Sequence, residues 1–558
     1  MGTISDKLMR IINTKEDIRQ ALISKGYDVP TSIPFKEYAK MISDLPCRVD
    51  SFPDIEGIVA RYSALGLTNE QMATNPVWVD KTGNGHDLQL KNFAWKGMSG
   101  VGGYGDENYQ TFYKFTLDDY VFIASPPGVK HMNFTFRVTG LQPGNKLTLA
   151  FFGTTNTVYG TWDKDGIYTV DADIVEAGKP TYFYNGYGAT RGEFTIEILP
   201  LYPGALVFDG VDDYGTCDNF PILTKEKGYT VVVLRQWDQD FLNTTLTGGL
   251  LSTRNYSTGE GVAFEKIESS NKGYWNLGAG GIIDFAKSPF TWQTSKQYNN
   301  VGILKGDKNH GKPLCVGCGL SGGQQCGRFA IWELVFLDHD ATEEELTKIK
   351  DYFVKTYPWL FSDQAWTVVG KTNEDEDRAT IANITGNGND LVLSNFGFAE
   401  GSGYNEEGEY AGYLVTDGVD DKIISSIFKM GNDWTVIGDW ELINTGKNDN
   451  AGIVKFDSIV IYNYNSMLIN IKNGRNILIP DQNTVNAICS DGRIYSKDWK
   501  ESIYNEETES TSKNFLTIGY SGNAYTKIAF KNLAIYPTVL SREDCIKAYN
   551  YLQTLKAK

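Results

Sequence analysis

The pentapeptide Asp-Gly-Val-Asp-Asp occurs twice in this chain, at residues 209–213 and 417–421, each time after a short apolar run. Its glycine can adopt a positive φ and its aspartates can accept hydrogen bonds from nearby backbone, so each copy predicts a tight hairpin. A second motif precedes each copy: Thr-Gly-Asn-Gly-His-Asp-Leu at 82–88 and Thr-Gly-Asn-Gly-Asn-Asp-Leu at 385–391. Two motifs repeated in the same order predict a duplicated folding unit.

The spacing between these motifs differs between the two copies. Gly83 and Asp209 are 126 positions apart, whereas Gly386 and Asp417 are 31 apart, which leaves 95 extra residues in the first copy. We therefore expect an inserted domain over residues 104–203. Short runs that alternate aromatic or β-branched residues with polar ones predict that it is a small antiparallel β-sandwich.

Both copies close in the same way. A long apolar strand, at 329–337 or 528–536, precedes a helix start with a Ser or Thr followed by acidic residues, at 342–345 or 541–545. Together with the Asp-Gly-Val-Asp-Asp motif, this ending resembles the laminin-G / concanavalin A-like lectin and glucanase superfamily. The resemblance implies a mainly β chain with two jelly-roll sandwiches, the first over 51–103 plus 204–360 and the second over 361–558.

Residues 1–46 have a different, helical pattern. Apolar residues recur at alternating spacings of four and three, interrupted by Lys15, which predicts a coiled-coil seam formed by Ile4, Leu8, Ile11, Ile18 and Leu22. The seam has no other helices nearby in sequence to bury it, so we favour an oligomerising or docking segment over a helical cap that folds back on the next domain.

The same segment carries a second resemblance. Its order of Ile-Ser-Asp-Lys-Leu at 4–8, Thr-Lys-Glu-Asp-Ile-Arg-Gln-Ala-Leu at 14–22, Lys-Gly at 25–26 and Pro-Phe-Lys-Glu-Tyr-Ala-Lys-Met-Ile at 34–42 is similar to a short N-terminal segment of appendage and baseplate proteins in tailed phages of gut bacteria. The resemblance implies attachment to other virion proteins, as a homotrimer.

Charge and hydrophobicity exclude several partners. The formal net charge is -17 and the pI is near 4.9, so a nucleic-acid groove or an anionic membrane surface is disfavoured. No apolar run approaches the roughly 20 residues that a membrane helix needs, and residues 1–10 have no apolar signal core. We expect a protein made in the host cytoplasm and assembled into the virion.

The seven cysteines are scattered and odd in number, which favours reduced thiols. His310, Cys315, Cys318 and Cys326 form a weak alternative as ligands of Zn²⁺. The matching stretch of the second copy, residues 516–519, has neither Cys nor His, so we interpret this region as an ordinary strand.

Catalytic motifs are missing from the sequence. Glucanases of the resembled superfamily carry Glu-x-Asp-x-x-Glu on one strand, and the nearest approach, Asp-Ala-Asp-Ile-Val-Glu at 171–176, lacks the first Glu and lies in the predicted insert. No Ser/His/Asp, phosphate-loop or His-Glu-x-x-His signature occurs. We expect no enzymatic activity, with a glycoside hydrolase as the weaker alternative because carboxylates on separate strands leave no linear motif.

Two sets of side chains are candidates for ligand binding. The repeated motif offers carboxylates to Ca²⁺, the one cofactor considered, although turns of this kind also form without metal: Asp209, Asp212, Asp213, Asp417, Asp420 and Asp421. In the insert, aromatic rings beside carboxylates and an amide suit a glycan: Trp162, Asp163, Asp165, Tyr184, Asn185 and Tyr187.

From these observations we expect a structural virion appendage, namely a tail fibre, a head fibre or a baseplate adhesin. Its N-terminal helices would dock it to the virion, and its lectin-like domains would bind a glycan on the bacterial surface. The alternative is a spacer or decoration protein without a ligand. A polysaccharide depolymerase is the less favoured third reading.

Overall fold

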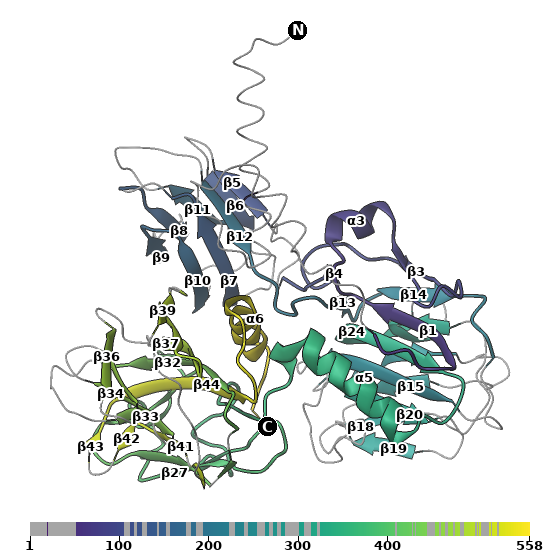
Figure 1. Ribbon diagram of the computed structural model, residues 1–558. Helices are drawn as coiled ribbons and strands as arrows, with labels where there is room; N and C mark the ends of the chain where they lie inside the picture. The colour runs from purple at the N-terminus through teal and green to yellow at the C-terminus, as the bar shows by residue number, and fades with distance from the viewer. Residues whose placement is uncertain are drawn as a thin grey trace.

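The protein was analysed as a computed structural model (Figure 1). The structure describes residues 19, 52–104, 112–115, 120–124, 131–141, 144–151, 157–173, 180–185, 194–222, 229–238, 241, 244–253, 263–266, 272–275, 281–284, 301–305, 314–320, 324–407, 410–426, 428–429, 431–443, 452–456, 459–463, 467–471, 475–479, 485–496, 499, 501–503, 513–514, 516–521 and 524–557. The five seam positions Ile4, Leu8, Ile11, Ile18 and Leu22 lie outside these ranges.

The first unit, residues 52–103 and 204–360, contains two facing sheets that are antiparallel except for the parallel pair β16–β23. One has the order β20-β15-β24-β13-β4, with β1 also on β24: β20 (Val301–Lys305), β15 (Thr230–Trp237), β24 (Arg328–Leu337), β13 (Leu206–Asp209), β4 (Gly100–Val101) and β1 (Ile58–Ser63). The other has the order β19-β18-β17-β16-β21-β14-β3-β2, with β23 on β16 and β22: β19 (Gly281–Asp284), β18 (Lys272–Trp275), β17 (Ala263–Lys266), β16 (Gly248–Ser252), β21 (Leu314–Val316), β14 (Tyr214–Cys217), β3 (Leu88–Lys91), β2 (Val77–Trp78), β22 (Cys318–Leu320) and β23 (Gln324–Cys326).

Alternation of apolar and polar residues places the core of this unit between the sheets. In β3, Leu88 and Leu90 are buried while Gln89 and Lys91 are exposed. β15 and β24 are buried along nearly their whole length, because one face meets the opposite sheet and the other face is covered by further chain. The apolar cluster between the sheets includes residues from both, such as Trp78, Phe208 and Phe336.

The second unit, residues 361–557, repeats this arrangement. One sheet has the order β28-β29-β44-β32-β37-β38-β39, with β25 on β44: β28 (Gly403–Tyr404), β29 (Leu414–Val415), β44 (Ile528–Tyr536), β32 (Thr435–Leu442), β37 (Val485–Cys489), β38 (Arg493–Ser496), β39 (Glu501–Ile503) and β25 (Gln364–Thr367). The other has the order β26-β27-β30-β41-β33-β34-β35-β36: β26 (Thr380–Ile381), β27 (Leu391–Ser394), β30 (Lys422–Ser425), β41 (Leu516–Ile518), β33 (Gly452–Phe456), β34 (Ile459–Asn463), β35 (Met467–Ile471) and β36 (Arg475–Ile479). Two separate strand pairs complete it: β31 (Phe428–Lys429) with β40 (Lys513–Asn514), and β42 (Tyr520–Ser521) with β43 (Ala524–Tyr525).

The insert, residues 104–203, forms two four-stranded sheets whose strands pair only with one another among the described residues. Their orders are β10-β7-β12-β5 and β6-β11-β8-β9: β10 (Gly166–Asp173), β7 (His131–Thr139), β12 (Phe194–Ile198), β5 (Phe112–Phe115), β6 (Tyr120–Ala124), β11 (Pro180–Asn185), β8 (Leu147–Phe151) and β9 (Thr157–Trp162). Strands β9 and β11 were not predicted. Their aromatic residues suggested ligand-binding loops, but Phe183 of β11 is fully buried in the core of the insert.

Within the described ranges, the helical elements with defined bounds are α3 (Asn69–Thr74), α5 (Glu343–Thr356), α6 (Arg542–Leu552) and the 3-10 turn η1 (Pro358–Leu360). The predicted capping box is present, because Thr342 accepts from the Glu345 backbone N–H while the Glu345 carboxylate accepts from the Thr342 N–H. No described helix is long and apolar enough to cross a membrane. The mainly β sandwich class is therefore confirmed.

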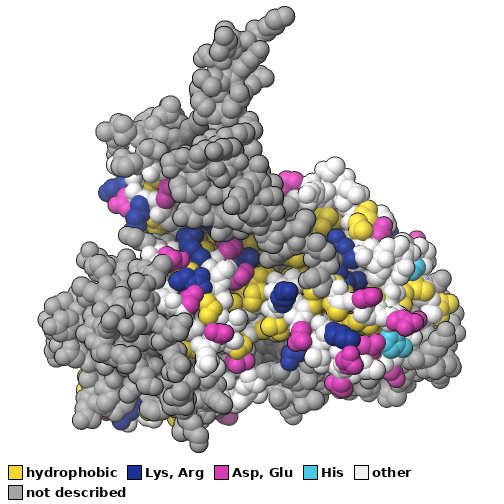
Figure 2. Space-filling view, in the orientation of Figure 1, with side chains coloured by type: hydrophobic (Ala, Val, Ile, Leu, Met, Phe, Trp, Pro, Cys, Tyr) yellow, Lys and Arg dark blue, Asp and Glu magenta, His cyan; other side chains and the backbone are white. Residues whose placement is uncertain are grey.

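Helix α6 lies between the second unit, the insert and the first unit (Figure 1). The Tyr551 hydroxyl donates to Gln236 Oε1 across 3.0 Å, and Arg137 of the insert lies 3.4 Å from the carboxylate of Glu543. Beneath these contacts a single apolar cluster contains buried residues of both units, together with Ile167 and Leu199 of the insert. On the described part of the face in Figure 2, acidic and basic side chains lie side by side around this junction.

The cysteine prediction is wrong for two residues. Cys318 and Cys326 lie opposite each other in the β22–β23 pair and form a disulfide. Neither can therefore act as a thiolate ligand of Zn²⁺ in this state, and His310 lies outside the described residues. Four other described cysteines are buried thiols: Cys217, Cys315, Cys489 and Cys545.

A buried ion pair ties β1 to β24 and α5 in the first unit. Arg61 Nε donates to Glu333 Oε2 across 3.1 Å, and Arg61 also donates to the Tyr352 hydroxyl across 2.9 Å. Tyr357 donates to Glu333 Oε1 across 2.7 Å. Burial raises the pKa of Glu333, and the Arg61 charge opposes that shift. The carboxylate therefore depends on its partners to stay ionised in the interior.

We predict that Arg61→Met lowers the free energy of unfolding of the first unit by about 3–5 kcal/mol, because Glu333 is left buried without its counter-charge. Urea unfolding followed by tryptophan fluorescence measures the loss. Adding Glu333→Gln should recover part of it, since a neutral amide can still accept from Tyr357. A loss below about 1 kcal/mol for Arg61→Met alone would contradict this account of the ion pair.

Candidate functional site

The Asp-Gly-Val-Asp-Asp motif forms a corner between two sheets, so the predicted hairpin is wrong. β13 before the motif pairs with β24 and β4, whereas β14 after it pairs with β21 and β3 in the other sheet. The second copy likewise joins β29 to β30, which belong to different sheets. The local turn chemistry was predicted correctly, but it does not determine which strands pair.

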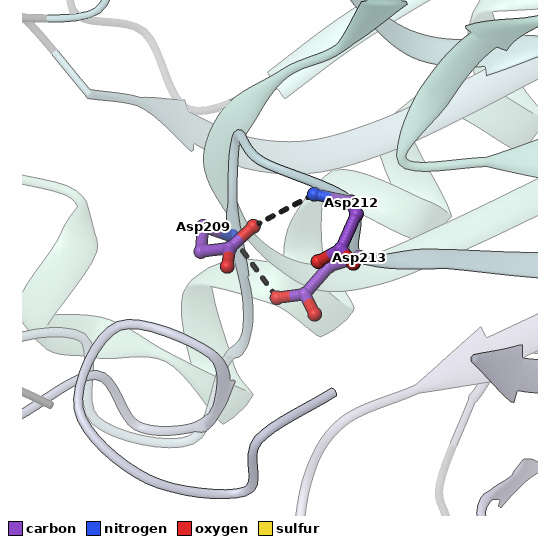
Figure 3. A group of neighbouring side chains, drawn as sticks. All are labelled: Asp209, Asp212 and Asp213. Carbon is purple, nitrogen blue, oxygen red and sulfur yellow. Dashed lines mark hydrogen bonds between the residues drawn. The ribbon is translucent and has the colours of Figure 1, made fainter. Parts of the chain in front are cut away.

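Each aspartate of the first corner has a distinct role (Figure 3). The Asp209 carboxylate accepts from the backbone N–H groups of Val211 at 2.7 Å and Asp212 at 3.4 Å. Asp213 is fully buried, and its carboxyl accepts from the Asp209 N–H at 3.1 Å and from the Ser99 hydroxyl at 3.0 Å. Hydrogen bonds from backbone N–H groups to the aspartates therefore stabilise the corner, and the bond from Ser99 to Asp213 connects it to the loop that carries Ser99.

Glycine is required at the second position of the corner. Gly210 has φ +78°, and a Cβ there would lie 2.8 Å from Cβ of Arg328. A side chain would meet both the strained left-handed conformation and this neighbour.

The second corner repeats the first at the level of single hydrogen bonds. Asp421 accepts from the Asp417 N–H at 2.7 Å and from the Ser402 hydroxyl at 3.1 Å. The upstream motifs match too, because Thr82 donates to Asp80 and Thr385 donates to Asn383, each across 2.8 Å. The duplication inferred from sequence therefore extends to side-chain geometry.

The corners could hold a cation only at a cost. Among the described residues, two groups of His, Cys, Asp or Glu could hold a metal ion: Asp209, Asp212 and Asp213, and Asp417, Asp420 and Asp421. Burial raises the pKa of Asp213 to about 8 and that of Asp421 to about 6, helped by the neighbouring aspartates. A protonated Asp213 carboxyl is a poor Ca²⁺ ligand, and one oxygen each of Asp209 and Asp417 already accepts backbone N–H groups of its own turn.

The glycan candidates of the insert separate into different environments. Trp162 is half-buried at the end of β9, with its ring 4.8 Å from that of Phe136 and 5.6 Å from that of Tyr168. Asp163 is exposed beside it. Asp165 accepts from the backbone N–H groups of Gly140 and Leu141 at 2.9 and 2.7 Å, so it stabilises a turn.

The remaining candidates are placed by their backbone alone. Tyr184 and Asn185 lie in β11, and Asn185 shares a row across the sheet with Leu147 and Trp162. Tyr187 lies outside the described residues.

Tyr159 and Tyr168 were not predicted as candidates. Both are half-buried and, with Trp162, border the core of the insert; we call these three residues the aromatic edge. The Tyr168 hydroxyl donates to the backbone oxygen of Lys164 at 2.8 Å, which fixes its ring beside Trp162. The two aromatic residues in 157–162 were the available sequence signal, but their spacing did not show which rings stay partly exposed.

Comparison with known proteins assigns no family. No family model and no curated protein matches the sequence. Solved structures similar to it include the botulinum neurotoxin serotype D binding domain, at 12% identity over 62% of this chain and 89% of that chain with a TM-score of 0.23. Another is Trypanosoma rangeli sialidase in complex with sialic acid, at 8% identity over 73% and 69% of the two chains with a TM-score of 0.26. Likenesses this distant support no conclusion about this chain.

We predict that replacing the buried carboxyl of the first corner changes how stability depends on pH. Burial raises the pKa of Asp213 from 3.8 to about 8 in the folded chain. Between pH 4 and pH 8, the Asp213 carboxyl is therefore protonated in the folded chain and ionised in the unfolded chain. The protonated carboxyl contributes fully to the free energy of unfolding below pH 4, and this contribution falls by about 1.4 kcal/mol per pH unit as the pH rises to 8.

Asp213→Asn keeps one donor and one acceptor but cannot titrate. From pH 4 to pH 8, the wild type should therefore lose more unfolding free energy than the variant does. Thermal unfolding across this pH range measures the difference, and Asp212→Asn at the exposed neighbouring position serves as control. A constant difference between Asp213→Asn and wild type would show that Asp213 is ionised throughout.

Proposed function

We propose that this protein is a non-enzymatic virion appendage of the concanavalin A-like class that presents a glycan-binding surface to a bacterial cell. The observation that carries the proposal is the continuous apolar cluster that joins both units and the insert through α6. Such a core holds the exposed loops of the three sandwiches in fixed relative positions, which suits presentation of a binding surface.

The aromatic edge supports glycan contact. Sugar rings stack their C–H faces on aromatic side chains, and a nearby carboxylate orients their hydroxyl groups. Trp162 and Tyr168 supply half-buried rings that the core holds in place, and exposed Asp163 supplies the carboxylate. At the corners, the carboxyl groups of Asp209 and Asp213 instead accept backbone N–H groups of the fold itself.

Attachment to a virion is proposed from the sequence of residues 1–46, which resembles the N-terminal segment of tailed-phage appendage proteins. A trimer would bring three copies of the aromatic edge to one surface, and linked weak sites gain avidity when all can engage together.

A spacer without a ligand is the second candidate. It is favoured by one observation, the packing of Trp162 against Phe136 and Tyr168, since a ring held by the core needs no sugar to explain it. Glycan binding by the intact chain decides between the two.

We predict that the labelled full chain binds a subset of bacterial surface polysaccharides on an array, and that Trp162→Phe and Asp163→Ala each weaken binding about 5–10-fold with little change in melting temperature. Val211→Ala, at a corner residue that is 73% exposed, should bind as wild type does. Absence of any glycan signal would favour the spacer, whereas equal losses for all three variants would show that the aromatic edge is not the binding site.

We predict that the seam of residues 1–46 sets the oligomeric state. Leu8→Asp combined with Ile18→Asp places two charges in the seam and should convert a trimer into the 62.2 kDa monomer, as measured by light scattering. Lys15→Leu, which fills the polar gap in the seam, should keep the trimer. A doubly substituted chain that remains trimeric would place the trimer contact elsewhere.

A further inference from the structure

Two thiols meet between the second unit's sheet and helix α6. Cys489 is the last residue of β37, and Cys545 lies in the first turns of α6. Both side chains are fully buried in the same apolar cluster, and each thiol affects the pKa of the other. The two thiols therefore lie close together between the sheet and the helix.

The surrounding contacts fix this meeting point from both sides. The Thr435 hydroxyl contacts Cys489 Sγ at 3.7 Å and accepts from the Leu540 backbone N–H at 2.9 Å. The Leu540 carbonyl accepts from the Cys545 thiol at 4.0 Å and from Arg493 at 3.0 Å. A short chain of contacts through Thr435 and Leu540 therefore connects the two sulfurs.

The duplication shows that packing alone does not require this pair. Cys489 lies opposite Thr435 on the neighbouring strand, as Lys305 lies opposite Thr230 in the first unit. Aligning the helix caps Ser541 and Thr342 places Leu346 where the second unit has Cys545. The first unit thus has neither sulfur, and the second unit has both.

The local charges assign different roles to the two thiols. The contact with Cys545 lowers the pKa of Cys489, and Arg493 adds to the effect. Burial raises the pKa of Cys545 well above its usual range. Arg493 lies on β38, which pairs with β37, so its charge still favours the Cys489 thiolate when α6 is undocked. Because the thiolate is the nucleophile in disulfide exchange, Cys489 is the attacking group and Cys545 the group that resolves the intermediate.

We propose that Cys489 and Cys545 form a second disulfide of this chain, with a small-molecule disulfide as the oxidant. The Cys489 thiolate attacks one sulfur of the oxidant, which forms a mixed disulfide and releases one small thiolate. Cys545 then loses its proton and attacks the Cys489 sulfur, which forms the internal disulfide and releases the second small thiol. Two protein thiols are oxidised and one small disulfide is reduced to two thiols.

Both sulfurs are buried, so the exchange takes place while α6 is undocked, either during folding or in a local opening of the helix. The bond would hold the first turns of α6 on β37. The same helix contacts the insert through Glu543, the first unit through Tyr551, and the ring of Trp359 through Lys547, whose Nζ lies 4.3 Å from the ring centroid. Oxidation would therefore fix α6, the helix through which the second unit contacts the insert and the first unit.

The test is disulfide mapping of the full chain. The protein is incubated with oxidised glutathione, quenched in acid, unfolded with an alkylating agent and digested for mass spectrometry. The expected result is a peptide pair that links Cys489 to Cys545, next to the Cys318–Cys326 pair as internal control. The oxidised chain should melt several degrees above a chain held in reduced glutathione.

Variants separate this bond from other effects. Cys545→Ala should lose the linked peptide and the added stability, while Cys217→Ala, at a buried thiol elsewhere, should keep both. Full alkylation of Cys489 and Cys545 beside an intact Cys318–Cys326 bond would overturn the proposal. A stable glutathione adduct on Cys489 with Cys545 alkylated would overturn it too. Mapping of the wild-type chain decides the matter even if a variant fails to fold.

Discussion

A buried aspartate at each sheet-to-sheet corner is the constraint on which the architecture depends. A sandwich needs the chain to leave one sheet and enter the other, and at that point backbone groups lose their ladder partners. Asp213 and Asp421 accept from the backbone of the corner and from Ser99 and Ser402, which join the corner to the preceding loop. The repeated motif thus marks one crossing between the sheets in each of the two sandwiches.

The two units share these corners but differ around their helices. In the first unit, the ion pair of Arg61 with Glu333 connects the sheet to α5 through Tyr352. In the second unit, the closing strand β44 instead carries Asn532, which lies opposite Thr367 and Asp439. There the two thiols Cys489 and Cys545 lie between the sheet and α6. α6 also contacts the other two parts of the molecule. Helix α6 of the second unit therefore holds the three parts of the molecule together, and this supports a function that needs them in fixed relative positions.

Sequence reasoning predicted the duplication, the mainly β class, the β character of the insert and the capping box of α5, because each depends on local periodicity or turn chemistry. It failed where distant pairing decides the outcome. The corner was mistaken for a hairpin, and the Cys318–Cys326 bond depends on the register of β22 and β23. Asp165, a predicted glycan contact, also stabilises a turn through two backbone N–H groups, and this role cannot be seen in sequence.

The central claim is that one core makes the two units and the insert a single rigid body. Native-state hydrogen exchange measures this directly, since amides that open together share one free energy of opening. The account predicts that the slowest amides of β24, β44 and α6 exchange through the same opening. Separate free energies for β24 and β44, with α6 following β44 alone, would contradict it.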